Sequence, residues 1–327
     1  MKNQIVAVMG TGSIGMRHLQ SLHAAGLKNS IAVPVRASRL MELRRHGFQT
    51  AENLAAASKL GAKACVIATD TGRHLRDALT ALDLGLDILV EKPLANDAAQ
   101  AREIAQAASK RRRKAYVACV LRFSESLNQF RKLLDKPGRL HAVAVECRSY
   151  LPDWRPGRRY KESYSARASE GGVLRDLIHE VDYAGWLFGW PKAVSARLKN
   201  LGRLGIRSEE MAELQWEAPQ GYRVNVNLDY LTRPTLRLVR AFGERGSLTW
   251  DWNSSSVIWA PANQRESRMT PEQSREKLYL AQTKAFLAAL QGRKGQRLAG
   301  LKDGIRALSI CDAARRAGRS RREEKIQ

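Results

Sequence analysis

The feature that most constrains the fold is a short apolar run followed at once by closely spaced glycines. Residues 4–9 read QIVAVM, and the loop that follows is Gly10-Thr11-Gly12-Ser13-Ile14-Gly15. Apolar residues then recur at roughly helical spacing up to residue 27, so the order is strand, tight turn and helix. In that order the glycines let the backbone approach a pyrophosphate, and the amides at the start of the helix face the phosphates. We therefore predict a dinucleotide-binding loop, against the alternative of a glycine-rich turn without a ligand.

Strand-like and helical segments alternate from this loop to about residue 121, which predicts a parallel, doubly wound sheet. Beyond residue 122 the pattern changes to a mostly antiparallel one, interrupted by a predicted helix over 172–188 and closed by helices over 276–290 and 302–317. The strands expected there are 140–148, 193–199, 211–217, 222–229, 236–241 and 247–252. We expect an α/β chain with a Rossmann domain over 1–121 and a substrate-binding and oligomerisation domain over 122–327, whose large sheet is open on one face.

The chain of 327 residues has a formal net charge of +24, with basic residues spread over both halves. A solvated basic surface explains this best, attraction of an anionic substrate comes next, and specific nucleic-acid binding comes last because aromatic residues do not interleave with the basic runs. The four cysteines form no C-x-x-C pair, so neither a disulfide framework nor a metal site is expected. No apolar stretch is long enough to span a bilayer, and we expect a cytoplasmic protein without membrane insertion.

A second motif lies at the end of another apolar run. Residues 86–90 read LDILV, and Glu91-Lys92-Pro93 follow. A lysine at the carboxyl end of a parallel strand points to where open α/β sheets bind ligands, and the proline ends the strand. We predict that Lys92 lies beside a bound nicotinamide.

The end of the second predicted strand bears on the choice of cofactor. NAD-binding proteins usually have an acidic residue there for the ribose 2′-hydroxyl. This chain instead has Arg36, Ser38 and Arg39, with no carboxylate between residues 27 and 41. These side chains suit a 2′-phosphate, so NADP is the preferred cofactor and NAD the alternative.

A third motif is the segment 171–183, which reads GGVLRDLIHEVDY. Asp176, His179 and Asp182 are spaced three apart, so on a helix they would share one side. Because a carboxylate can fix the tautomer of a histidine and stabilise its protonated form, we predict a catalytic role for His179. The alternative is an ion pair on a helix surface.

Together these motifs resemble the glucose–fructose oxidoreductase / inositol dehydrogenase (Gfo/Idh/MocA) family over nearly the whole chain. The resemblance includes segment 68–74 (ATDTGRH), in which Thr69 and His74, together with Glu91 and Lys92, would belong to the cofactor site. It implies NAD(P)-dependent redox chemistry on sugars, a frequently cis Lys92–Pro93 bond, and a homodimer or homotetramer formed through the C-terminal sheet. Many family members place the aspartate four residues before the histidine, so the family role transfers more safely to His179 than to Asp176.

A narrower resemblance covers segment 150–156 (YLPDWRP) and continues to residue 183. It is similar to a branch associated with bacterial surface-sugar biosynthesis. Tyrosines and arginines suit an acidic, phosphorylated or nucleotide-linked sugar, although several of them could serve only to order a long loop. The predicted substrate-binding residues are Arg122, Trp154, Tyr164, Arg167 and His179.

The predicted reaction is reversible hydride transfer between a sugar carbon and the nicotinamide. His179 would be the acid or base, and Lys92 would hydrogen-bond the reacting oxygen, although Lys92 could itself be the base. One rival is a glycoside hydrolase that uses transient oxidation by a retained NAD. Another is a non-catalytic protein that senses NADP or a sugar.

Overall fold

The structure is a computed structural model that describes residues 4–155, 157, 159–293, 295 and 297–327. Pro156, in the segment 150–156, lies outside the described residues. The chain separates into unit 1, which is Met1–Phe123 with Ser274–Ile305, and unit 2, which is Ser124–Gln273 with Arg306–Gln327. This division differs from the expected 1–121 and 122–327, because residues 274–305 pack with the first unit.

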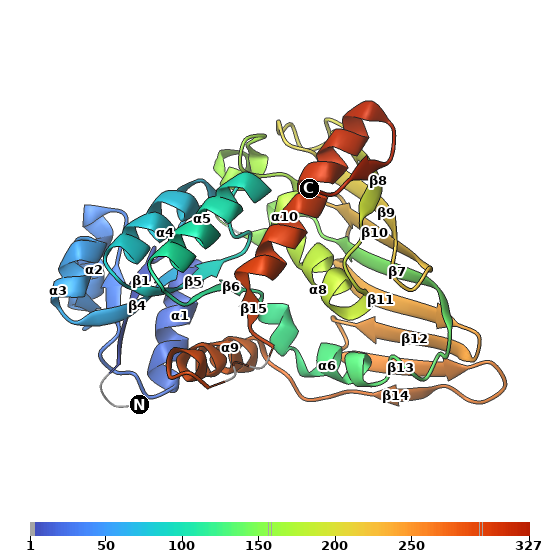
Figure 1. Cartoon of the computed structure of the whole chain (residues 1–327), viewed down its shortest axis with the longest axis horizontal. Helices are drawn as coiled ribbons and strands as arrows, with labels where there is room; N and C mark the ends of the chain where they lie inside the picture. The colour runs from blue at the N-terminus through green and yellow to red at the C-terminus, as the bar shows by residue number, and fades with distance from the viewer. Residues whose placement is uncertain (1–3, 156, 158, 294, 296) are drawn as a thin grey trace. The chain divides into compact units, whose positions relative to one another are not determined.

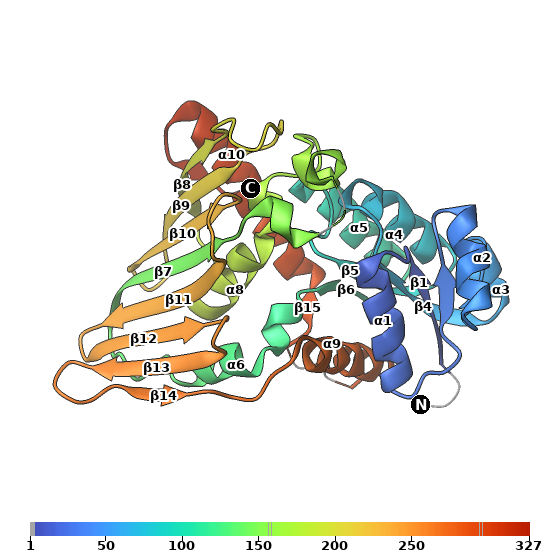
Figure 2. The same ribbon diagram turned by 180° about the vertical axis from the view of Figure 1, so that it is seen from behind.

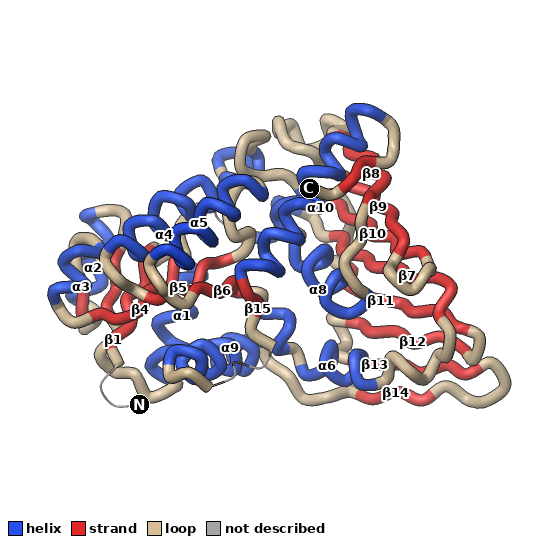
Figure 3. Tube along the Cα trace, in the orientation of Figure 1, coloured by secondary structure: helices blue, strands red, loops and turns tan. Residues whose placement is uncertain are grey.

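Unit 1 is built on a sheet whose strands appear in red in Figure 3. In the described part of the chain its order is β15-β6-β5-β4-β1-β2-β3, and all neighbours are parallel except β15 with β6. The strands are β1 (Ile5–Met9), β2 (Ile31–Val33), β3 (Gln49–Thr50), β4 (Ala62–Ile67), β5 (Asp87–Glu91), β6 (Ala115–Ala118) and β15 (Ala299–Gly300). The predicted parallel sheet is confirmed, and its strand order reverses between β1 and β4, where such sheets bind ligands at their carboxyl ends.

Helices cover both faces of this sheet, which is why its strands are apolar on both sides. Figure 1 shows α4 and α5 on one face, and Figure 2 shows α1 and α9 side by side on the other. Phe286 and Leu287 of α9 are buried in the same cluster as Val6 and Val8 of β1, which explains why α9 belongs to unit 1. The helices are α1 (Ser13–Ala24), α2 (Ala37–Arg45), α3 (Leu54–Lys59), α4 (His74–Asp83), α5 (Ala98–Lys110) and α9 (Arg275–Leu290), with short 3-10 turns at Thr71–Arg73 and Val120–Phe123.

Unit 2 is dominated by a large, mostly antiparallel sheet (Figure 3). Among described residues its order is β14-β13-β12-β11-β7-β10-β9-β8-β16, and β7 pairs in parallel with β10. The strands are β7 (Leu140–Arg148), β8 (Ala193–Lys199), β9 (Met211–Glu217), β10 (Arg223–Asp229), β11 (Leu236–Gly243), β12 (Gly246–Asp251), β13 (Ser256–Pro261), β14 (Ser267–Met269) and β16 (Glu324–Lys325). The predicted antiparallel sheet is confirmed, and β13, β14 and β16 extend it beyond the predicted strands.

Buried and partly exposed residues alternate along these strands, so the sheet has one buried face and one open face. Val143, Val145 and Cys147 of β7 are buried, whereas the residues between them are partly exposed. The buried face is covered by helices, because α8 contacts β7 and β10, and α6 contacts β12 and β13. The helices of this unit are α6 (Glu125–Lys132), α7 (Val173–Asp176), α8 (Ile178–Phe188) and, from Arg306 on, α10 (Leu301–Ser320), with 3-10 turns at Leu151–Trp154, Tyr160–Glu162 and Tyr164–Ala166.

The predicted helix over 172–188 is wrong in one respect. It is divided into α7 and α8 at Leu177, whose backbone angles of φ −96° and ψ 31° are not helical. Asp176 therefore ends one helix, and His179 and Asp182 lie on the next. No glycine or proline marks this break in the sequence, so helical spacing alone did not predict it.

In the part of the chain that the structure describes, no helix combines the length and the apolar character needed to cross a membrane.

Candidate cofactor and catalytic sites

The glycine loop lies between β1 and α1 and approaches the loop that follows β4. Gly10 has a φ of +87°, and a Cβ added there would lie 2.6 Å from the carbonyl oxygen of Ala68. A Cβ on Gly15 would collide with the carbonyl oxygen of Gly10. Nothing lies within 4 Å of a Cβ built on Gly12, which is the N-cap of α1. The loop thus combines two forced glycines with an open glycine at a helix N-terminus, which fits a pyrophosphate.

The end of β2 leads into α2, with Arg36 as the N-cap residue of that helix. Arg36 and Ser38 are exposed, and Arg39 forms an ion pair with Glu42 one turn further on. The hydrogen bond from Arg39 holds the pKa of Glu42 below its usual value. Of the two predicted guanidiniums, Arg39 is therefore already engaged by a carboxylate.

The Lys92 turn is held by the residue before it. Glu91 is 8% exposed; its Oε1 lies 2.8 Å from Nε2 of His18, and its Oε2 accepts the backbone N–H of Lys92 at 3.1 Å. His18 belongs to α1, the helix that begins at the glycine loop, and its ring packs edge-on against Tyr279 of α9. The Lys92–Pro93 bond is cis. Sequence patterns did not predict the role of His18, because a lone histidine on a helix gives no such signal.

The loop after β4 carries two other residues predicted to bind the cofactor. The Thr69 hydroxyl donates to Asp77 Oδ2 at 2.9 Å, and Arg73 binds the same carboxylate. His74 is 1% exposed, with Nδ1 2.8 Å from the Pro93 carbonyl oxygen and Nε2 3.0 Å from that of Thr69. The hydrogen bonds described here for Thr69, His74 and Glu91 lie within unit 1, so direct contact of these residues with a cofactor stays a prediction.

Arg122 was predicted to bind substrate, and the structure shows an internal partner for it. The side chain is 3% exposed, and its Nη1 donates to Asp303 Oδ2 at 2.9 Å within unit 1. Arginine side chains are rarely buried to this extent unless they are paired with an opposite charge. Its role towards substrate therefore stays a prediction.

In unit 2, Asp176 is buried at the end of α7. Its Oδ2 accepts a hydrogen bond from the hydroxyl of Tyr230 at 2.7 Å, and burial raises the pKa of Tyr230 well above its usual value. Trp154 packs edge-on against Tyr230 with ring centroids 5.4 Å apart, and its indole N–H donates to Ser149. The structure thus brings predicted residues Asp176 and Trp154 together around Tyr230, which was not predicted to be a site residue.

His179 is partly exposed on α8, and Asp182, one turn further on, is 3% exposed. Between them Glu180 is fully buried, with Oε1 2.8 Å from Nε of Arg237 in β11. Tyr183 donates its hydroxyl to the same carboxylate oxygen at 3.4 Å. This buried ion pair fixes the rotation of α8 on the sheet and thereby the direction in which His179 emerges.

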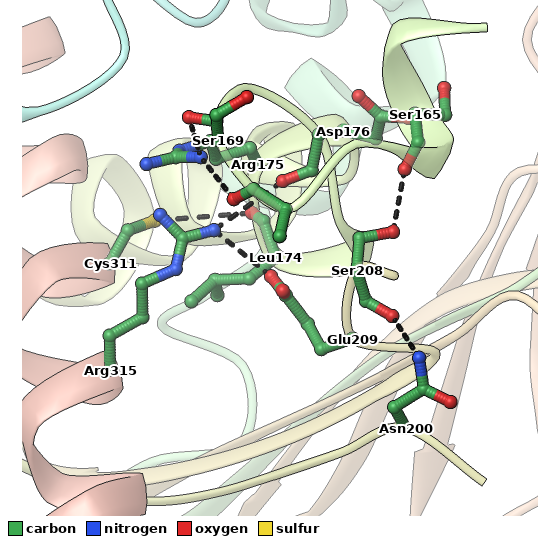
Figure 4. A network of polar contacts seen from close by, with 12 residues as sticks. Ser165, Ser169, Leu174, Arg175, Asp176, Asn200, Ser208, Glu209, Cys311 and Arg315 are labelled. Atoms are coloured by element: carbon green, nitrogen blue, oxygen red, sulfur yellow. Dashed lines mark hydrogen bonds and ion pairs between the residues drawn. The ribbon is translucent and has the colours of Figure 1, made fainter. Parts of the chain in front are cut away.

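The segment before α7 is held by two arginines (Figure 4). Arg175 donates to the carbonyl oxygen of Ser169 at 2.8 Å. Arg315 of α10 donates to the carbonyl oxygen of Gly171 at 3.5 Å and pairs with Glu209 at 3.0 Å. Burial, followed by the neighbouring Arg315, lowers the pKa of Arg175. In the same segment, Tyr164 is partly exposed and Arg167 is exposed.

The guanidinium carbon of Arg155 lies 5.5 Å from the centroid of the Tyr164 ring, and Arg167 forms an ion pair with Glu170 at 2.6 Å. No group of three or more His, Cys, Asp or Glu side chains placed to hold a metal occurs among the residues that the structure describes. The free cysteines Cys65, Cys119, Cys147 and Cys311 are all buried.

Two family models match the chain. One is described as an oxidoreductase family with an NAD-binding Rossmann fold and matches residues 5–119, and the other, the GFO/IDH/MocA C-terminal domain, matches residues 128–249. The rhizopine catabolism protein MocA of Rhizobium meliloti is 30% identical over 189 residues, which are 56% of this chain and 57% of that protein. The chain thus matches little more than half the length of this relative.

Solved structures with low sequence identity have the same fold. Levoglucosan dehydrogenase in complex with NADH and levoglucosan has a TM-score of 0.87 at 17% identity, covering 99% of this chain and 100% of that one. The WlbA dehydrogenase of Bordetella pertussis, in complex with NADH and UDP-GlcNAcA, has a TM-score of 0.84 at 19% identity, covering 100% and 98%. With both domain models matched in order along the sequence, the chain belongs to the Gfo/Idh/MocA family of oxidoreductases.

Proposed function

We propose that the protein is an NAD(P)-dependent oxidoreductase that transfers a hydride between a nicotinamide and a hydroxyl- or ketone-bearing carbon of a sugar or sugar derivative. The observation that carries the proposal is the hydrogen bonding of Glu91. One carboxylate oxygen holds the Lys92 amide, and the other contacts His18 in the helix that starts at the glycine loop. The backbone at Lys92 is thereby held at the same sheet edge as the loop that suits a dinucleotide.

The chain's own residues then have separate tasks. Oxidation of a hydroxyl requires its proton to leave the oxygen, and we assign that proton to His179, supported by Asp176 and Asp182. Lys92 donates a hydrogen bond to the same oxygen and stabilises the negative charge that develops there. The converse assignment, with Lys92 as the base, is the alternative.

Substitution of Lys92 by methionine tests this proposal, since it keeps the length of the side chain and removes its charge. We expect turnover to fall by about 10²–10³-fold while cofactor affinity changes little. Turnover is followed by nicotinamide absorbance with a panel of sugars and nucleotide sugars. Lys110→Met, at an exposed position in the last turn of α5, is the control and should match the unmodified protein. Full turnover in Lys92→Met with unchanged cofactor binding would show the mechanism to be wrong.

For the cofactor, we propose a preference for NADP. Arg36 is the exposed guanidinium at the start of α2, whereas Arg39 is paired with Glu42. Arg36→Ala is expected to weaken NADPH binding about tenfold or more and to leave NADH binding unchanged, because only NADPH has the 2′-phosphate. Arg45→Ala, at the exposed end of the same helix, is the control. Tighter binding of NADH than of NADPH by the unmodified protein would overturn the preference.

For the substrate, we propose an acidic or nucleotide-linked sugar. The support comes from the tyrosine- and arginine-rich segment 150–167 and from UDP-GlcNAcA, the ligand in the complex of the structurally similar WlbA dehydrogenase. Trp154, Tyr164 and Arg167 are the residues of this segment assigned to the sugar. A screen in which only neutral sugars are turned over would contradict the proposal that the substrate is acidic.

We also propose that the protein forms a homodimer or homotetramer through the open face of the unit 2 sheet. That face carries the hydrogen-bonded pair Gln215 and Asn225, with Arg240 on β11 also exposed. Light scattering of the full chain tests this, and a monomer at micromolar concentration would contradict it.

A further inference from the structure

The side chain of His74 stands between two backbone carbonyl groups. It is the first residue of α4 and is 1% exposed. Its Nδ1 lies 2.8 Å from the carbonyl oxygen of Pro93, and its Nε2 lies 3.0 Å from that of Thr69. Both distances are those of hydrogen bonds, and both partners are acceptors only.

The chemistry of imidazole makes this arrangement depend on a proton. A neutral ring has one N–H group and one nitrogen lone pair, so it donates to one carbonyl and faces the other with a lone pair. Only the doubly protonated ring donates to both oxygens. The charged ring of His74 therefore donates a hydrogen bond to both carbonyl oxygens, those of Thr69 and Pro93. The neutral ring donates to only one of them at a time.

The two carbonyl groups belong to different loops at the carboxyl edge of the unit 1 sheet. Thr69 follows β4, and its backbone lies so close to Gly10 that a Cβ on that glycine would be 2.8 Å from the Thr69 nitrogen. Pro93 follows β5 and comes directly after Lys92. A ring that binds both carbonyls thus ties the Lys92 turn to the loop that packs on the glycine loop.

We propose that His74 is a positioning residue whose protonation joins the Thr69 loop to the Lys92–Pro93 turn and so fixes Lys92 relative to the dinucleotide loop. For its consequence in turnover this inference rests on the proposed function of Lys92. The two hydrogen bonds of the His74 ring, to Thr69 and to Pro93, are called the brace below, and both lie within unit 1.

The charged groups around the ring act in opposite directions. Burial lowers the pKa of His74, and this effect is the largest; the two carbonyl groups and the carboxylates of Glu91 and Asp77 act against it. Glu91, on β5, acts on the ring through its charge and is itself engaged by His18 of α1, whereas Asp77 lies on α4. Asp77 is in turn bound by Thr69, Arg73 and Arg76. The neutral ring therefore dominates at neutral pH, and the second hydrogen bond forms as the pH falls.

Histidine-selective ¹⁵N NMR of the full chain tests the protonation step. The chain has six histidines, and the resonances missing in His74→Gln identify His74. We expect one ring nitrogen of His74 to stay protonated throughout and the other to gain its proton in a single step on acidification. A ring that stays neutral down to the pH of unfolding would overturn the proposal, and the unmodified protein alone decides this if the variant does not fold.

Hydrogen–deuterium exchange tests the joining of the loops without any need for a substrate. After correction for the intrinsic exchange rate, peptides covering 68–73 and 92–97 should exchange about tenfold more slowly once His74 is charged. His74→Gln supplies a neutral donor at every pH, so its exchange should not respond to pH, whereas His23→Gln on the exposed side of α1 should behave like the unmodified protein. Equal pH responses in the protein with and without His74 would overturn the brace. If His74 titrates as expected but Lys92→Met keeps full turnover, the proposed function fails and the brace stands.

Discussion

The hydroxyl of Tyr230, the residue directly after β10, donates a hydrogen bond of 2.7 Å to the carboxylate of Asp176 at the end of α7. Both side chains are buried, with Tyr230 at 0% and Asp176 at 3% exposure. The bond joins the sheet of unit 2 to the short helix that precedes His179. It therefore ties the break between α7 and α8 to a rigid support.

Removal of that hydroxyl should be costly. Tyr230→Phe takes away a donor from a buried carboxylate, and we expect the free energy of unfolding to fall by about 1–3 kcal/mol, measured by urea denaturation. Tyr160→Phe is the control, because the Tyr160 hydroxyl bonds a backbone carbonyl at 3.1 Å in a partly exposed position, and it should cost less. Equal losses in the two variants would contradict a special role of the Tyr230–Asp176 bond.

The buried ion pair of Glu180 and Arg237 should behave differently from an exposed one. Removal of one partner by Glu180→Gln or Arg237→Met is expected to cost about 3–5 kcal/mol, since the other charge then stays buried without its counter-charge. The double variant should recover a large part of that loss. In contrast, Arg159→Ala breaks the exposed Arg159–Glu162 pair and should change stability by no more than about 1 kcal/mol. Additive losses in the double variant would show that the two side chains do not act as a pair.

The glycine loop allows stability and cofactor binding to be separated. Gly10→Ala forces a Cβ against the Ala68 carbonyl at a φ of +87°, so we expect a lower free energy of unfolding together with weaker cofactor binding. Gly12→Ala meets no atom within 4 Å, so stability should stay within about 0.5 kcal/mol while the new methyl group hinders the pyrophosphate. Urea denaturation and calorimetric titration with NADPH measure the two effects. Unchanged NADPH affinity in Gly12→Ala would contradict binding at this loop.

The buried cysteines predict a loss of stability at alkaline pH. Burial raises the pKa of Cys65, Cys147 and Cys311 to about 12, from an ordinary value of 9.0. The folded state thus favours the neutral thiol. Its stabilising contribution is complete below pH 9 and is lost as the pH rises from there towards 12, because the unfolded thiols ionise first.

The urea midpoint should therefore fall between pH 8 and pH 10.5, and Cys311→Ala should make that fall shallower. A slope that is the same with and without Cys311 would contradict the contribution of this thiol. At pH 8 an aromatic disulfide reagent should label none of the cysteines until denaturant is added, since all of them are buried.

Local patterns were sufficient for the parts of the molecule in which neighbours in sequence decide the structure. The apolar run before Gly10 and the spacing to Gly15 predict β1, the turn and α1, because each depends on residues only a few positions apart. The helices α3 and α5 begin after Asn53 and Asp97. The side-chain oxygen of each residue accepts a hydrogen bond from the backbone N–H three residues further along the helix. The alternation of apolar and polar residues likewise predicted β7 and β9.

Contacts between distant segments were beyond such patterns. The bonds from His18 to Glu91 and from His74 to Thr69 and Pro93 depend on how the strands of unit 1 are ordered, which no single segment encodes. The placement of α9 in unit 1 depends on Phe286 and Leu287 fitting a cluster formed by β1 and α1. Each of these contacts exists only after chain segments far apart in sequence have packed together.

The amino-acid sequence thus specified the fold class and the glycine loop between β1 and α1, because periodicity and turn chemistry are local properties. The break at Leu177, the partners of Asp176 and Glu180, and the bracing of the Lys92 turn by His18 and His74 were decided by the tertiary structure. The physical reason is that buried polar side chains must find partners, and the folded sheet, rather than the neighbouring sequence, determines which partners lie within hydrogen-bonding distance.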